Sequence, residues 1–164
     1  MGLFKLLRSF FRPRPPPPPR RPADARLAQD PWLGGVFARL GDRYQLGADG
    51  PDGARILRRT GRARFNPMPV WLTSAGKLVR GDYEVRGQGD RDVAAAQSRS
   101  LLDQRVTGQL EALGLLPSGE SVEEWAGTVL TRRYQGRCES PEQAAAAVRF
   151  LCEESETQIN TAAE

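Results

Sequence analysis

Five arginines lie close together in the middle of the chain, and the planar guanidinium group of arginine suits bidentate binding of phosphate. They are Arg55, Arg58, Arg59, Arg62 and Arg64. Three aromatic residues near them, Phe65, Trp71 and Tyr83, have rings of the kind that stack on bases. This combination is typical of nucleic-acid contact. The alternative is that the rings belong to the core of a small sheet, whose arginine-rich outer face docks on acidic helices.

The sequence of 164 residues contains no histidine, the commonest general base and metal ligand. Its two cysteines, Cys138 and Cys152, are too few for a structural zinc site and are expected to be free thiols. Neither a phosphate-binding nor a dinucleotide-binding glycine motif is present. The neighbouring acids at 123–124 and 153–154 would point about 100° apart on helices, so they cannot converge on one substrate. We therefore expect a non-catalytic protein without a metal or another cofactor.

Residues 2–12 separate completely into an apolar and a basic face when they are placed on an α-helix. The apolar residues span an arc of about 160°. They are Leu3, Phe4, Leu6, Leu7, Phe10 and Phe11, and the basic residues opposite them are Lys5, Arg8 and Arg12. Such a short helix is not stable alone in water, so it must fold against another surface.

Residues 13–22 include five consecutive prolines and are expected to form a stiff polyproline linker about 31 Å long. The helix ahead of it, residues 1–12, has the profile of an anchor that lies in the plane of an anionic membrane surface. A groove in another protein would accept the same apolar face. No apolar run is long enough to span a bilayer, and basic residues interrupt any secretory signal. A cleaved organellar targeting segment stays an alternative.

The net charge of +4 conceals alternating blocks of charge. Residues 1–22 carry +6, residues 23–53 carry −2, residues 54–91 carry +6 and residues 92–164 carry −6. The two basic blocks favour an anionic partner, although the blocks would neutralise one another if they met in the fold.

We expect one small α+β domain over residues 23–156, followed by a frayed tail at 157–164. Its elements begin with a core-facing helix at 31–44, capped by Asp30, and a turn at 47–53. Short strands at 54–65, 69–73 and 77–86 would form an antiparallel sheet of two or three strands, with Arg80-Gly81-Asp82 as a turn. Three C-terminal helices then follow their caps Asp90, Ser121 and Ser140, and end near residues 113, 135 and 154.

The sequence thus predicts a non-catalytic accessory or adaptor protein, cytoplasmic and peripheral at a membrane surface or membrane complex, to which residues 1–12 tether it. Two alternatives stay open. One is a nucleic-acid-binding protein that uses the arginine-rich region 54–65. The other is a subunit of a complex whose N-terminal helix docks in a neighbouring protein.

Overall fold

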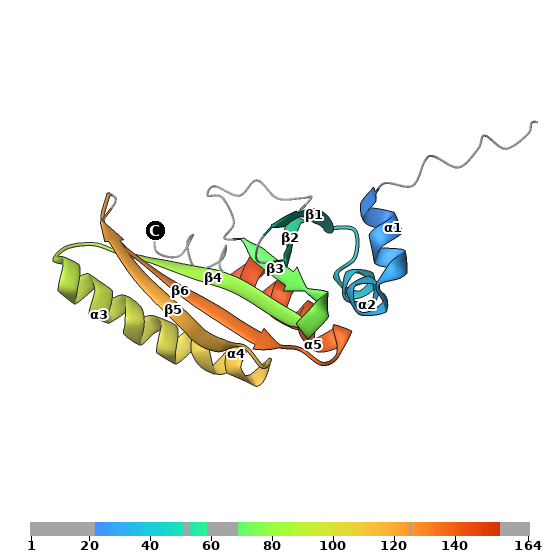
Figure 1. The fold of residues 1–164 in the computed structure, drawn as a ribbon. Coiled ribbons are helices and arrows are strands. Elements are labelled where there is room, and N and C mark those ends of the chain that lie inside the picture. Colours follow the sequence, from blue (N-terminus) through green and yellow to red (C-terminus); the bar gives the residue numbers. More distant parts are fainter. Residues whose placement is uncertain (1–21, 51–52, 59–68, 125, 155–164) are drawn as a thin grey trace, which may run out of the picture.

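The computed structural model describes residues 22–50, 53–58, 69–124 and 126–154. In this described part, six strands form one antiparallel sheet in the order β1-β2-β3-β4-β6-β5 (Figure 1). The last strand along the chain is therefore inserted between β4 and β5. The strands are β1 Tyr44–Gly50, β2 Gly53–Arg58, β3 Val70–Thr73, β4 Leu78–Gly87, β5 Leu116–Glu124 and β6 Thr128–Arg137.

The described helices cover one face of this sheet, which we call the helix face. Ala94 of α3 lies over Gly87 of β4, and Leu151 lies over Gly81 of the same strand. Figure 1 shows α5 behind the sheet and α3 running along its β5 side. The helical segments are α1 Pro22–Gln29, α2 Pro31–Leu40, α3 Arg91–Leu102, a π-helical turn Asp103–Thr107, α4 Gly108–Ala112, α5 Pro141–Arg149 and a final π-helical turn Phe150–Glu154.

Alternation of buried and more exposed residues along the strands explains why the sheet has one covered face. The residues that point toward the helices form the core together with apolar residues of α2, α3 and α5. On the strands they include Leu46, Ile56, Val70, Leu72, Val79, Tyr83, Leu130 and Tyr134. The residues between them point to the opposite side, which we call the open face because no described helix covers it.

Local signals fix where the helices begin. The side chain of Asp30 accepts a hydrogen bond from the Leu33 N–H at 2.9 Å, and Pro31 occupies the first helical position of α2. Ser140 accepts from the Gln143 N–H at 3.1 Å at the start of α5. Gly41, with φ 73°, ends α2 because a residue with this positive φ cannot continue a right-handed helix.

The expected fold was wrong in its sheet and in its helices. The sheet has six strands, not two or three, and the three C-terminal helices reduce to two helical regions, α3 to α4 and α5. Residues 122–135, predicted as a helix, belong to β5 and β6. The predicted turn at 47–53 contains most of β1 and the start of β2, and the helix at 31–44 ends at Leu40.

Other expected elements are found. The helix that follows Asp90 and stops at Gly114 is present as α3, the π-helical turn and α4, and Gly114 has φ 86°. Strands 69–73 and 77–86 correspond to β3 and β4, so Arg80-Gly81-Asp82 is the middle of a strand and not a turn. The predicted anchor, most of the linker and the tail at 157–164 lie outside the described residues, as do residues 59–65 of the predicted strand 54–65, whose first five residues belong to β2.

Candidate functional site

Strand register places Arg55, Trp71 and Arg80 in one line across the open face. Arg55 of β2 is opposite Trp71 of β3, and Trp71 is opposite Arg80 of β4. Their chain neighbours are core residues, so the pleat turns these three side chains away from the helices. Paired side chains on adjacent strands have Cβ atoms about 5 Å apart, so the indole has a guanidinium-bearing side chain on each side. We call these residues the Arg–Trp–Arg row.

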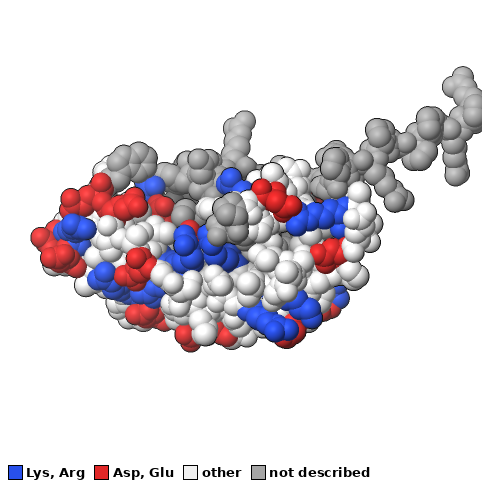
Figure 2. Space-filling view, in the orientation of Figure 1, with Lys and Arg blue, Asp and Glu red and all other residues white. Residues whose placement is uncertain are grey.

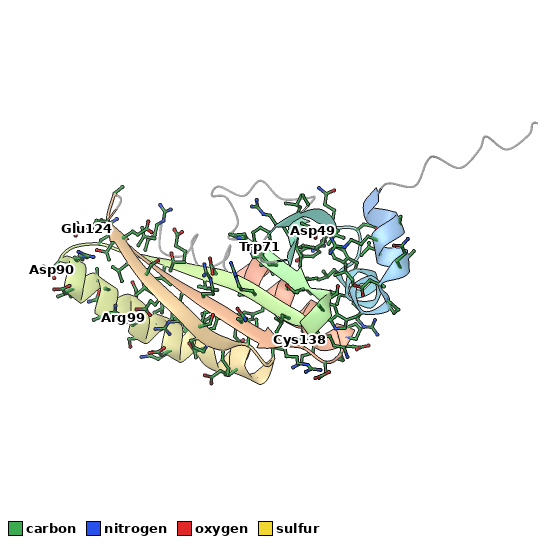
Figure 3. The ribbon with its side chains drawn as sticks, viewed as in Figure 1. Asp49, Trp71, Asp90, Arg99, Glu124 and Cys138 are labelled. Atoms are coloured by element: carbon green, nitrogen blue, oxygen red, sulfur yellow. The ribbon has the colours of Figure 1, made fainter. Side chains whose placement is uncertain are left out.

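The indole of Trp71 lies across β2 toward the edge strand β1. A Cβ atom added to Gly50 of β1 would lie 3.0 Å from Cζ3 of Trp71. A larger residue at position 50 would therefore crowd the ring. Trp71 is half-buried and Arg55 is exposed. Figure 3 shows Trp71 well away from Asp90 and Glu124, which share one end of the molecule.

The structure brings together only part of the predicted arginine site. Arg55 is on the open face, whereas Arg59, Arg62 and Arg64 lie outside the described residues together with the side chain of Arg58 and with Phe65. The two other aromatic candidates separate: Tyr83 is fully buried on the helix face, and Trp71 lies on the open face. Arg80 was missed because Gly81 beside it favoured a turn. Alternation of Val79, Gly81 and Tyr83 with charged residues was the signal for a strand.

The open face carries more basic than acidic side chains. Among the described strand residues that register places there, five are arginines and three are acidic. The arginines are Arg55, Arg80, Arg86, Arg133 and Arg137, and the acids are Asp82, Glu84 and Glu123. Figure 2, which views this face, shows Lys and Arg side chains gathered over the middle of the sheet and Asp and Glu toward the end where α3 begins.

Two of these acids are engaged by neighbouring arginines. Arg133 donates from Nε and Nη2 to the two carboxylate oxygens of Asp82, at 2.8 and 3.2 Å. Arg86 donates from Nε to Glu84 at 2.8 Å. A third arginine of the face, Arg137, pairs with Glu139 just beyond β6, with its Nε 2.7 Å from Oε1.

A shallow hollow of about 220 Å³ lies beside the row, between β4, β6 and β5. It is lined by Asp82, Gly119, Glu120, Ser121, Thr131 and Arg133. The volume is below the 300–1,000 Å³ that is usual for small-molecule sites. Arg133 and Asp82 in its lining bind each other. The hollow is therefore too shallow to enclose a small ligand, and this pair adds little net charge to it.

A second arginine cluster lies under the helices and has a structural role. Arg132 of β6 is buried and donates to Glu120, to Asp103 and to Oγ1 of Thr107. The hydroxyl of Thr107 also lies 3.0 Å from that of Tyr134. Burial alone would lower the pKa of Arg132, but its hydrogen bonds with Asp103, Glu120 and Tyr134 outweigh burial and raise the pKa. The cluster fastens the π-helical turn to β5 and β6.

Neither cysteine forms a disulfide, as the sequence predicts, and both are buried. Burial raises the pKa of the Cys138 thiol to about 11, and its Sγ lies 3.6 Å from the carbonyl oxygen of Leu113. A thiol with such a pKa is almost entirely protonated at neutral pH, so Cys138 is a packing residue and a poor nucleophile. Within the described ranges, no three acidic or cysteine side chains are grouped so that they could hold a metal ion.

Comparison of the chain with protein-family models, with curated proteins and with solved structures found no match. The described helices include none whose length and apolar character would allow it to cross a membrane.

Proposed function

We propose that the chain is a non-catalytic binding protein, held at the cytoplasmic surface of a membrane by residues 1–12, with its six-stranded domain carried on the polyproline linker. The observation that carries this proposal is the complete separation of residues 2–12 into an apolar and a basic face. The first described helix, α1, begins at Pro22. In the sequence, the proposed anchor precedes the domain and is separated from it by the polyproline linker.

The energetics of the N-terminal segment favour lipid over a groove in a protein. The apolar face supplies insertion, and each basic residue near an anionic leaflet adds about 1 kcal/mol. The linker residues Arg14, Arg20 and Arg21 would extend this attraction beyond the helix itself. A groove in a protein partner would use the apolar face but would have no need for basic residues along the linker.

The domain supports a binding role through the way its charged groups are used. Arg132 and Glu120 fasten helices to the sheet, and Arg133 and Asp82 bind each other. The surface that they leave for contact is the open face, with its exposed Arg55 and half-buried Trp71. A face whose described hollow is as small as about 220 Å³ suits macromolecules better than small substrates.

Vesicle flotation of the full chain tests the tether. We expect binding to vesicles that contain phosphatidylserine, with weaker binding to neutral vesicles. The double variant L7E/F10E should abolish binding to both, because it removes the apolar face. The matched variant K5Q/R8Q makes the same change in net charge but keeps that face and the other arginines, so it should only weaken binding to anionic vesicles, by about 30-fold for two charges.

Equal flotation of the full chain and of a chain that lacks residues 1–21 would contradict the tether. The tether would also be contradicted if both double variants lost binding while the unmodified chain bound neutral and anionic vesicles equally. Capture of L7E/F10E by vesicles at the wild-type level would show that another part of the chain holds the membrane.

A further inference from the structure

We propose that the Arg–Trp–Arg row binds single-stranded nucleic acid, with a base stacked on Trp71 and the phosphates on either side of it held by Arg55 and Arg80. This site is independent of the membrane tether. It involves a different part of the chain. Of the arginines predicted at 54–65, the structure describes Arg55 on the open face, and the proposed site combines it with Trp71 and Arg80.

The order of side chains in the row matches the order of groups along a single strand. A nucleic-acid backbone presents a phosphate, a base and the next phosphate, and the row presents an arginine, a tryptophan and a second arginine on adjacent strands. The row spans three adjacent strands, hence about 10 Å at the usual strand spacing. Arginine provides bidentate donors for phosphate, and the indole provides a stacking surface for any base.

The charge of the open face favours a polyanion at this position. The five arginines of the face outnumber its three acids, and Asp82 and Glu84 are engaged by Arg133 and Arg86. The third acid, Glu123, lies on β5 at the far edge of the sheet from β2 and β3. A strand that enters along the row therefore meets positive potential near Trp71 and stays clear of the acidic end at Asp90 and Glu124.

The aromatic residue distinguishes nucleic acid from the other anionic partners. A lipid surface or an acidic peptide would use the arginines, but neither offers a planar group that stacks on an indole. A duplex would also use the arginines, but its bases are already stacked on one another. The row therefore predicts a preference for single strands that depends on Trp71.

Fluorescence anisotropy with a labelled twelve-nucleotide oligo(U), and with a duplex of equal length, tests the site in the full chain. Trp71→Leu should weaken binding of the single strand by between about 5-fold and 150-fold, the range for loss of one base–aromatic stack. Arg55→Gln should weaken binding and reduce the salt dependence by about one counterion. Because both variants keep the basic N-terminus, its contribution is common to all the titrations.

Arg105→Gln is the matched control, because Arg105 is an exposed arginine on the π-helical turn of the helix layer. It removes the same charge and should leave oligo(U) binding unchanged. Oligo(U) should also quench tryptophan fluorescence in wild type and much less in Trp71→Leu. Thermal unfolding of each variant separates loss of binding from loss of fold. If Trp71→Leu does not fold, Arg55→Gln against Arg105→Gln still decides the role of the row.

Three outcomes would overturn the proposal. The first is equal loss of binding in Arg55→Gln and Arg105→Gln, which would mean unspecific attraction. The second is equal affinity for duplex and single strand, which would leave stacking without a role. The third is binding of phosphatidylserine vesicles that requires Arg55 and Trp71 when oligo(U) binding does not, which would make the open face a lipid-contact surface.

Discussion

Arg132 of β6 donates two hydrogen bonds to one carboxylate oxygen of Glu120 of β5, from Nε at 3.0 Å and from Nη2 at 2.9 Å. The other oxygen of Glu120 accepts from Nε of Arg99 in α3 at 2.6 Å. Glu120 thus joins the edge strand, the central strand β6 and the helix layer. Because its partner Arg132 is buried, this carboxylate balances a charge that has little access to water.

The first prediction concerns the unequal cost of removing either member of this pair. Glu120→Gln leaves a buried guanidinium group with Asp103 as its remaining carboxylate, and we expect a loss of about 2 kcal/mol in the free energy of unfolding. Arg132→Met replaces the charge with an apolar side chain of similar length, and it should cost less, about 1 kcal/mol. Urea unfolding monitored by circular dichroism measures both. A larger loss for Arg132→Met would contradict this explanation.

The second prediction is that stability falls in acid, partly through Glu120 and Asp30. Burial would raise the pKa of Glu120, but hydrogen bonds from Arg99 and Arg132 outweigh it and lower the pKa below 4.5. Burial would likewise raise the pKa of Asp30, but the hydrogen bond from the Leu33 N–H helps to lower it below 3.8. Since the unfolded chain then binds more protons, each carboxylate stabilises the fold above its ordinary pKa. That stability is lost as pH falls through the lower folded pKa.

Urea unfolding from pH 7 to pH 3 tests this titration. The slope of unfolding free energy against pH below about 4.5 should be shallower in Glu120→Gln than in wild type. Glu123→Gln, an exposed change on the same strand, is the control and should follow the wild-type curve. Parallel curves for wild type and Glu120→Gln would show that Glu120 does not contribute to acid sensitivity.

The third prediction concerns the crossing of two backbone segments at Gly136. A Cβ atom there would lie 1.7 Å from the carbonyl oxygen of Gly114 and 2.8 Å from Cα of Leu115. Backbone must move to admit a methyl group, so Gly136→Ala should cost at least about 3 kcal/mol. Gly108→Ala, on α4 with open space around it, should stabilise the protein by about 0.5–1 kcal/mol. Thermal unfolding of the two variants should shift the midpoint in opposite directions.

The elements that sequence predicted correctly have strong local signals. Asp30 and Ser140 are capping residues in the structure, and the α3 region runs between an aspartate cap and a left-handed glycine. These signals act within one helical turn, so they survive whatever packs around them. Arg55 was identified from arginine density alone. Its position on the open face depends on strand pairing, which no short stretch of sequence determines.

Residues 122–135 show why the sheet was underestimated. Val122, Val129, Leu130 and Tyr134 fit a helical stripe, and Ser121 with Glu124 imitates a capping box. In the structure, Leu130, Arg132 and Tyr134 alternate along β6 toward the helices. Arg132 breaks the apolar alternation that would have indicated a strand. It can point inward because Glu120 and Asp103, which are distant in sequence, balance its charge. The turn at Ala126-Gly127, with φ 50° and 123°, carries only a weak hairpin signal.

The insertion of β6 between β4 and β5 determines when the sheet can be completed during synthesis of the chain. β5 is synthesised before β6, but β6 is the strand with which it pairs in the described sheet. Until β6 is synthesised, the edge of the ten-residue strand β4 that faces β6 is therefore unpaired. The sheet closes only when Arg137, which pairs with Leu78, has emerged. A chain released earlier exposes β4 as a template for other chains. β6 is therefore needed to cover the edge of β4, and we expect a chain that ends before residue 128 to aggregate.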